Sequence, residues 1–333
     1  MPSDTNVISK LLPVPSSAID CGFSTVLSLT HDIPQVSYVP FDDHALGVHK
    51  VTSRTTHNVV KPPISDEQHT EAWEAIFHKG SINPGNKEAP PGGFGFYLRG
   101  PDEFSGKLRE SDEVLFSYEV LFEPGWIWQK GGKLPGIYGG VGNSAYGCTG
   151  GRQTDRCRCF NLRLMWRENG IGELYAYVPQ NEANKHNLKL VPPKSRQHPD
   201  YGFSVGRGAF KFAPGQWIAV AERVKMNTVG TENGDLFNEM NVCGQIIERS
   251  VPLGEIEVFI DGVSVIKATG LVLGESEAPD SRVQGIHFQT FFGGNSPEWA
   301  SPKNQKAWFT NISGAILRAG RDTTVARPVK DEL

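Results

Sequence analysis

The stretch "CFNLRLMWRENGIGELYAYVP", residues 159–179, contains two runs of alternating side chains joined by a turn-forming segment. The apolar positions of the first run are Phe160, Leu162, Leu164 and Trp166. Those of the second run are Leu174, Ala176 and Val178. Successive side chains of a strand point to opposite faces of a sheet, so each run predicts a strand with one face toward a core. The short link "ENGIG" predicts that the two strands pair as an antiparallel hairpin.

Similar runs recur along the chain, separated by Gly, Pro, Asn and Asp. Further strands are predicted at 93–98, 113–122, 216–226, 255–261, 263–268, 286–292 and 306–317. "IDGV", residues 260–263, is a signal for a two-residue hairpin turn. Only residues 65–77 suggest a helix, because Ser65 and Gln68 have capping-box spacing. This pattern predicts an all-β jelly-roll sandwich of two antiparallel sheets with a concave groove.

The 333 residues divide into three predicted parts. Residues 1–65 are rich in Pro, Ser, Thr and His, and are predicted to form an irregular N-terminal extension that packs on the core. Residues 66–320 are predicted to form the jelly-roll domain. Residues 321–333 are a polar tail that ends in "KDEL". We expect a monomer.

Charge is distributed unevenly along the chain. The net charge of −4 gives no reason to expect a nucleic-acid partner, and no apolar run is long enough to span a membrane. Residues 125–167 nevertheless carry seven basic side chains and one acid, Asp155. The basic positions are Lys130, Lys133, Arg152, Arg156, Arg158, Arg163 and Arg167. This segment is either a local anion-binding site or a solvated basic face.

The five cysteines do not have metal-site spacing. "CRC" at 157–159 has no second pair and no nearby histidine, so no metal is expected. Cys148 and Cys159 flank a short Gly-rich loop and can close it as a disulfide if the protein is secreted.

The two ends of the chain give conflicting signals about location. "KDEL" has the form of an endoplasmic-reticulum retrieval signal, whereas the first 20 residues have no apolar leader. We expect a secreted protein whose leader is absent from this chain, with an endoplasmic-reticulum location as the alternative. "NIS" at Asn311 is a glycosylation motif.

The polar face of the predicted hairpin carries reactive side chains. If Arg167 lies opposite Glu173, then Arg163 lies opposite Tyr177 and Met165 opposite Tyr175. Asn161 shares this face with Arg163 and the two tyrosines.

Arginine binds carboxylates in a bidentate manner, and a neighbouring cation favours a tyrosine phenolate. A carboxylate-binding arginine beside a tyrosine acid or base suits removal of the proton α to a carboxylate. In a 4-linked uronic acid this proton is on C5, and loss of the C4 oxygen completes a β-elimination. The alternative is a Tyr–Arg ladder that only stabilises the sheet.

"GGKLPGIYGG", residues 131–140, surrounds Lys133 with five glycines and one proline, and Tyr138 follows. Such a run predicts a loop whose backbone turns or approaches another group closely. It is either a surface turn with a solvated lysine or a floor on which an anionic ligand lies close to the backbone.

The chain resembles polysaccharide lyase family 14 over residues 90–318. The resemblance lies, in chain order, in "GGKLPGIYGG", the Gly-rich loop bounded by Cys148 and Cys159, "CFNLRLMWR", "GELYAYVP" and "FQTFFGGNSPEWASPKNQKAWF" at 288–309. The resemblance implies a β-jelly roll, alginate or glucuronan lyase activity, a fungal-type member, an acidic polysaccharide substrate and no cofactor. By position, it makes Lys133, Arg163, Tyr175 and Tyr177 the catalytic residues. Asn161 departs from the serine often found in the family, and is expected to bind substrate. Which tyrosine acts as base and which as acid stays open, as does Lys133 as the base.

Other side chains are candidates for substrate binding. His287 and Gln289 share a strand face in "IHFQTFF", with a structural histidine as the alternative. Tyr97 and Arg99 form another same-face pair, either a subsite or an edge-strand pair, and Tyr138 is a further candidate. Trp126 and Trp128 either stack on sugars or belong to the core.

Two other functions compete with the lyase. A jelly-roll glycoside hydrolase needs two carboxylates, for which Glu255, Glu257 and Asp261 are the candidates. A lectin-like module would bind carbohydrate without chemistry. The polymer, and endo or exo action, stay open.

Overall fold

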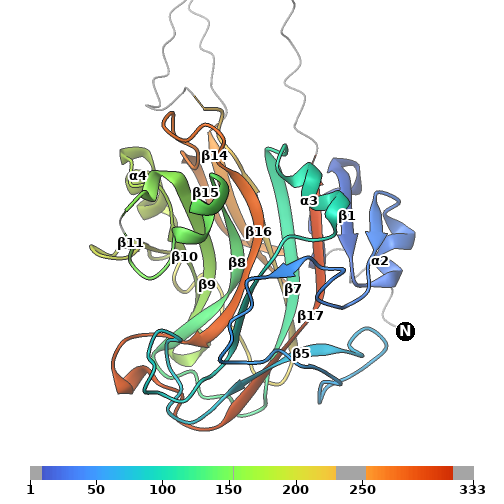
Figure 1. The fold of residues 1–333 in the computed structure, drawn as a ribbon, viewed down its shortest axis with the longest axis vertical. Coiled ribbons are helices and arrows are strands. Elements are labelled where there is room, and N and C mark those ends of the chain that lie inside the picture. The colour runs from blue at the N-terminus through green and yellow to red at the C-terminus, as the bar shows by residue number, and fades with distance from the viewer. Residues whose placement is uncertain (1–9, 153, 230–252, 318–333) are drawn as a thin grey trace, which may run out of the picture.

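The computed structural model describes residues 10–152, 154–229 and 253–317. The predicted tail 321–333 and Cys243 lie outside the described residues. Two β-sheets, here called sheet A and sheet B, pack face to face (Figure 1). The prediction of an all-β jelly-roll sandwich is confirmed.

Sheet A has nine strands. Seven follow the order β15 (Val263–Leu271), β14 (Gly254–Ile260), β13 (Trp217–Lys225), β7 (Glu113–Phe122), β17 (Gln305–Leu317), β1 (Ile19–Ser24) and β2 (Val36–Tyr38). β5 (Ala72–Phe77) pairs with β17, and β4 (Val59–Val60) pairs with β5. All these pairs are antiparallel except β1 with β2.

Sheet B has eight strands with antiparallel neighbours. Their order is β11 (Arg196–Gln197), β12 (Phe203–Val205), β10 (Gly172–Tyr177), β9 (Cys159–Arg167), β8 (Gly131–Gly140), β16 (Arg282–Phe292), β6 (Phe94–Leu98) and β3 (Val48–His49). The α-helices are α2 (Leu27–Asp32), α3 (Asp102–Leu108) and α4 (Glu182–Leu190). The 3₁₀ turns are η1 (Ser16–Ala18), η2 (Gly142–Gly147), η3 (Arg156–Arg158), η4 (Glu168–Gly170) and η5 (Pro297–Trp299). Across the described ranges, none of the helices combines the length and apolar character needed to cross a membrane.

The core lies between the two sheets and contains the apolar face predicted for the hairpin. Phe160, Leu162, Leu164 and Trp166 are fully buried there, as are the apolar positions of β10. Trp126 and Trp128 pack in the same core, which supports the core interpretation of this pair.

The β9–β10 hairpin forms, but its predicted register is wrong by two residues. Tyr175 lies opposite Arg163 rather than Met165, and Tyr177 lies opposite Asn161. The connecting loop is shorter than expected, because Arg167 N–H already donates to the carbonyl of Ile171. Since side chains alternate with a period of two, a two-residue shift keeps every side chain on its predicted face.

The glycine-rich run 131–140 is the ten-residue strand β8, not a loop. It pairs with β9 on one side and β16 on the other, and it is buried along its length. Gly132, Gly136 and Gly139 lie so close to neighbouring side chains or carbonyls that a Cβ atom would approach them within 2.6 Å. The glycines therefore let a strand pass through a crowded sheet.

A bulge interrupts β8 between Lys133 and Gly136. Lys133 and Tyr138 are five residues apart, and an odd spacing would place them on opposite faces of a regular strand. The extra residue brings both to the face away from the core, while Leu134 and Ile137 pack inside.

Two groups from sheet A hold the backbone of this bulge. Ile137 N–H donates to Oε2 of Glu222 on β13 at 2.7 Å, and the Tyr118 hydroxyl on β7 donates to the carbonyl of Pro135 at 3.2 Å. Glu222 is buried, and within the described residues its Oε1 has no hydrogen-bond partner. Burial raises the pKa of Glu222 well above its ordinary value of 4.5.

The predicted helix at 65–77 is wrong. Asp66 Oδ1 accepts from the N–H groups of Gln68 and His69 and forms a turn, and residues 72–77 form β5. Pairing with β17 and burial of alternate side chains outweigh the local capping signal.

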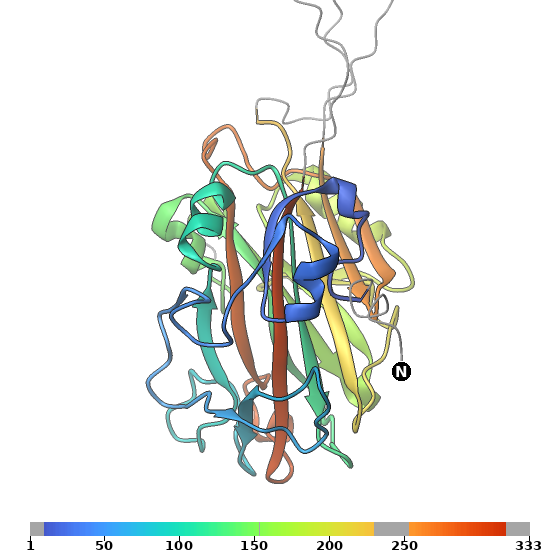
Figure 2. The same ribbon diagram turned by 90° about the vertical axis from the view of Figure 1, so that its right-hand side faces the viewer.

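The N-terminal region is more regular than the sequence indicates. It contributes β1, β2 and β4 to sheet A and β3 to sheet B. Residues around α2 also cover the outer face of sheet A (Figure 2). There, Leu12 and Leu29 belong to the same apolar cluster as Leu115 and Ala315. Apolar residues widely spaced in the sequence make this cluster, so no local period reveals it.

Three smaller predictions concern single positions. Ile260 and Val263 close the expected two-residue turn, in which Asp261 and Gly262 both have positive φ. Cys148 and Cys159 form a disulfide that joins the end of η2 to the start of β9. Asn311 is buried in β17, and its side chain bonds to Glu119, so the motif does not present a glycosylation site.

Candidate active site

Three adjacent strands of sheet B bring the four predicted catalytic side chains together. Lys133 lies on β8, Arg163 on β9, and Tyr175 and Tyr177 on β10. Tyr175 pairs with Arg163, which in turn pairs with Gly136 of β8. Opposed residues on neighbouring strands have Cβ atoms about 4.5–5.5 Å apart. The cluster lies on the face of sheet B that points away from the core.

Lys133 is only 7% exposed, and its Nζ lies 3.7 Å from the centroid of the Tyr175 ring and 5.4 Å from that of Tyr177. Among the described residues, nothing accepts a hydrogen bond from this nitrogen. Burial, followed by the charges of Arg163 and Arg167, lowers the pKa of Lys133 well below its ordinary value of 10.5. Lys133 can therefore be a neutral amine that accepts a proton.

The two tyrosines behave differently from the expectation that arginine favours their phenolate forms. Burial raises the pKa of Tyr175 to about 12. Burial also raises the pKa of Tyr177, although Arg163 and Arg156 act in the opposite direction. Desolvation outweighs the attraction of the cations, so both hydroxyls stay protonated near neutral pH. Each is suited to donate a proton.

Arg163 is held by two amide oxygens. Its Nε donates to Asn161 Oδ1 at 3.0 Å, and its Nη1 donates to Gln289 Oε1 on β16 at 2.5 Å. A guanidinium has five N–H donors, so these bonds leave others for a carboxylate. The structure thus brings Gln289 to the cluster as a partner of Arg163.

Asn161 connects Arg163 to His287. Because arginine only donates, Asn161 must present its oxygen to Arg163 and its NH₂ group to His287 Nδ1, at 3.0 Å. Burial, together with Arg163 and Lys133, lowers the pKa of His287 well below its ordinary value of 6.5. The neutral ring then carries its proton on Nε2. Asn161 is fully buried. Its role in substrate binding stays a prediction.

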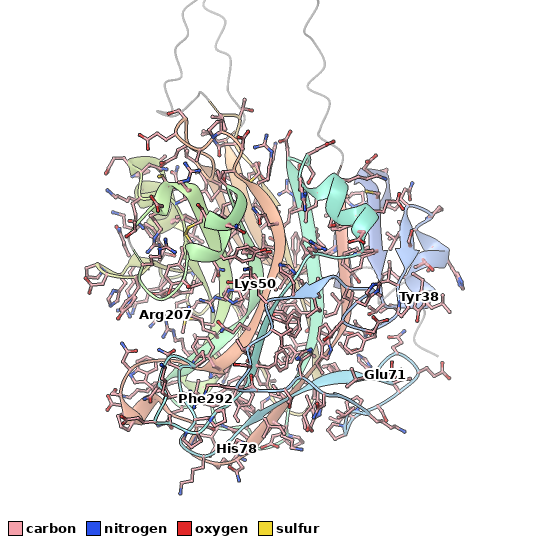
Figure 3. The ribbon with its side chains drawn as sticks, viewed as in Figure 1. Tyr38, Lys50, Glu71, His78, Arg207 and Phe292 are labelled. Atoms are coloured by element: carbon pink, nitrogen blue, oxygen red, sulfur yellow. A yellow bond between two sulfur atoms is a disulfide. The ribbon has the colours of Figure 1, made fainter. Side chains whose placement is uncertain are left out.

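An acidic group that the sequence did not single out balances the charge of this face. Glu173 is fully buried and accepts hydrogen bonds from Arg167 Nε at 2.9 Å and from Ser204 Oγ at 2.7 Å. Arg207, labelled in Figure 3, also pairs with it. Burial acts to raise the pKa of Glu173, but Arg167 and Arg207 lower it overall. Glu173 is therefore a carboxylate whose oxygens are already bonded to Arg167, Ser204 and Arg207.

Arg156 is a second group of this site that the sequence indicated only as part of a basic segment. Its guanidinium lies 5.1 Å from the centroid of the Tyr177 ring. Its Nε and Nη2 donate to the carbonyls of Arg152 and Tyr201 at 2.9 and 3.0 Å. Arg156 lies in η3, just before β9, where no periodic pattern reveals its direction.

The remaining candidates extend from the cluster along sheet B. Tyr97 of β6 stacks on His287 with ring centroids 4.2 Å apart, and Tyr138 meets Tyr97 edge-on at 4.7 Å. Arg99 lies further out, where its Nη2 is 3.6 Å from Asp102 Oδ1. The structure therefore joins Tyr97 to the cluster and leaves Tyr138 and Arg99 at its far end.

The carboxylates of the hydrolase alternative lie elsewhere. Glu255 and Glu257 are on β14 of sheet A, where both bond to Arg223 at 3.0 and 3.2 Å. Asp261 is in the turn after β14, 3.6 Å from Lys10. In the part of the chain that the structure describes, no three His, Cys, Asp or Glu side chains gather as metal ligands.

Comparison with known proteins identifies the family. The model of the polysaccharide lyase 14 family matches residues 65–253 and 245–312, which is more than half of the chain. The chain belongs to polysaccharide lyase family 14. It is a polysaccharide lyase, as the family resemblance predicts.

Solved structures agree with this membership. The family 14 alginate lyase from Aplysia kurodai is 30% identical with a TM-score of 0.63, over 84% of this chain and 96% of that one. The alginate lyase vAL-1 from Chlorella virus is 22% identical with a TM-score of 0.57, over 82% of this chain and 93% of that one. The second likeness shows the fold alone. No curated protein sequence gives a significant match.

Proposed function

We propose that this lyase cleaves a 4-linked polyuronate by β-elimination, with alginate as the first candidate polymer. The observation that carries the proposal is the buried Lys133 amine, which has no hydrogen-bond partner among the described residues. It lies against the rings of two protonated tyrosines, and Arg163 is close enough to lower its pKa. The relative that is 30% identical is an alginate lyase, which supports alginate. Glucuronan offers the same carboxylate and C5 proton, and is the second candidate.

The free donors of Arg163 bind the uronate carboxylate beside the scissile bond. Pairing with this cation stabilises the enolate-like charge that develops when C5 loses its proton. Asn161 and Gln289 act as positioning residues, because they hold Arg163 from two sides. The neutral His287 offers its Nε2–H as a further donor.

Lys133 and one tyrosine transfer the protons. Neutral Lys133 Nζ takes the C5 proton, and the C5–H electron pair forms the C4–C5 double bond. The C4–O4 bond breaks, and O4 takes the hydroxyl proton of Tyr175 or Tyr177. The products are a 4,5-unsaturated uronate end and a saturated reducing end. After product release, the Lys133 ammonium loses its proton to solvent and the tyrosine phenolate takes one up, which restores the site.

The test is a panel of alginate, glucuronan and other glucuronate polymers, followed by far-ultraviolet absorbance of the unsaturated product. We expect Lys133→Ala and Tyr175→Phe to lower kcat by roughly 10²–10⁴-fold, the usual contribution of general acid–base groups. Tyr38→Phe is the matched control, because Tyr38 is exposed on β2 of the other sheet.

Absence of unsaturated product from every polymer would refute the elimination. Saturated ends would instead identify a hydrolase, and binding without turnover would identify a lectin-like module.

A further inference from the structure

A second cationic site lies on the same face of sheet B, beyond the reaction centre. A cavity of about 450 Å³ opens beside Tyr138 and Tyr146. Arg99, Arg109 and Arg282 all line it, and Asp280 is an acid in its lining. Cavities of this size commonly hold ligands the size of a sugar residue or larger.

The arginines of this cavity come from three separate segments. Arg99 follows β6, Arg109 caps the end of α3, and Arg282 begins β16. Arg109 is exposed, and Arg282 uses Nη1 to bond the carbonyls of Pro279 and Ser281 at 3.1 and 2.8 Å. These bonds fix the direction of the Arg282 guanidinium and leave its other donors for a ligand.

Aromatic rings connect the cavity to the reaction centre. Tyr97 stacks on His287 and contacts Tyr138 and Tyr146, at 4.7 and 4.8 Å between ring centroids. Tyr146 is held by His49 Nε2 at 3.0 Å. The Nζ of Lys50, which is labelled in Figure 3, lies 4.5 Å from the centroid of the Tyr146 ring. Polar and aromatic side chains therefore lie between the two sites.

The register of β8 gives the separation of the two sites. Gly136 pairs with Arg163, and Gly140 pairs with Arg282. Four residues of strand span roughly 13 Å along β8, and the lateral distance adds to this because Arg163 and Arg282 lie on opposite sides of β8, on β9 and β16. A single sugar ring held by Arg163 does not reach Arg282, but a uronate further along the same polymer does.

We propose that Arg99, Arg109 and Arg282 form a second carboxylate-binding subsite. It binds a uronate of the same polymer that lies at a distance from the scissile bond. This proposal rests on the proposed polyuronate substrate. Its consequence is a dependence on chain length: substrates long enough to fill both sites bind more tightly than shorter ones.

The test compares Arg109→Gln and Arg282→Gln on sodium alginate and on 4-linked mannuronate oligomers of two to eight residues. We expect KM for the polymer to rise roughly tenfold in each variant, the size of one charge-assisted hydrogen bond. The rise should be smaller for the shortest oligomers. Lys267→Gln is the matched control, because it removes one positive charge from β15 of sheet A. The subsite would be overturned if Arg109→Gln and Arg282→Gln had the same KM as the control Lys267→Gln. A rise in KM that is the same for every oligomer length would also overturn it.

A binding measurement separates this subsite from the proposed reaction. Calorimetry with the mannuronate octamer uses Lys133→Ala with and without Arg282→Gln. Weaker binding in the double variant supports the subsite even if no polymer is ever cleaved. Equal binding refutes the subsite whatever the reaction proves to be.

Discussion

At the scale of the residue, Lys133 occupies an unfavourable position. A buried polar group without a hydrogen bond destabilises a folded protein, and among the described residues Lys133 Nζ has no such partner. Within the described residues, its Nζ lies against the faces of the Tyr175 and Tyr177 rings. The same isolation that lowers the pKa of Lys133 gives it the free electron pair that the proposed elimination needs.

Lys133→Met should therefore abolish turnover and increase the free energy of unfolding, by about 1–3 kcal/mol near neutral pH. The pKa of Lys133 is lower in the folded state, so between that pKa and pH 10.5 the unfolded chain binds a proton that the folded chain does not. The wild type consequently loses stability relative to the variant as pH falls from 10.5, by at most about 1.4 kcal/mol per unit. Urea unfolding at several pH values measures this difference. A variant that is less stable than the wild type at neutral pH would contradict the argument.

At the scale of the element, the bulge in β8 orients the site. It brings Lys133 and Tyr138 to one face, and it is held across the core by Glu222 and Tyr118. Glu222 is an acid whose burial keeps it protonated, so it serves as an uncharged acceptor for Ile137 N–H.

Glu222→Gln preserves this acceptor, whereas Glu222→Leu removes it. We expect the leucine variant to be less stable than the glutamine variant by about 1–3 kcal/mol, because a buried N–H loses its partner. The leucine variant should also lose activity as Lys133 shifts. Equal stability of the two variants would show that the bulge does not depend on this bond.

The pH dependence has a definite sign. The raised pKa means that folded Glu222 keeps a proton that the unfolded chain releases above about pH 4.5. Wild-type stability should fall relative to Glu222→Gln as pH rises from 4.5, which thermal or urea unfolding of both proteins can follow.

The elements also show which features local sequence can predict. Strands β7 and β9 have their predicted bounds, because alternation and β-branched or aromatic side chains are local signals. β8 was predicted as a loop, because a glycine-rich strand depends on neighbours that local sequence does not reveal. The alternation of side chains predicted which residues share each face of the β9–β10 hairpin. The register of the hairpin instead depends on the geometry of the Arg167–Ile171 turn. Bringing Gln289 and Arg156 to this face requires tertiary pairing that no short motif contains.

At the scale of the whole molecule, charge is separated. The chain has 37 acidic and 33 basic side chains, yet Lys133, Arg163, Arg156 and Arg167 gather around one pair of tyrosines. A cluster of cations in an acidic protein attracts a polyanion, whereas the net negative charge of the rest of the protein repels it.

We expect kcat/KM for the polymer to fall several-fold as sodium chloride rises from low to high concentration, since salt screens this attraction. The effect should be weaker for a uronate disaccharide, which carries fewer charges. Initial rates over a salt series measure both. A salt response that is equal for polymer and disaccharide would contradict electrostatic steering by the cationic cluster.

The position of β17 has a consequence for synthesis. This strand lies between β7 and β1, and Ile19 pairs with Leu317, so two strands made early share a neighbour made very late. The β8–β10 meander, by contrast, is contiguous and can pair as soon as it leaves the ribosome. Its apolar face then stays exposed to solvent until sheet A covers it. During translation this lyase should expose a half-built core and depend on chaperones until residue 317 emerges.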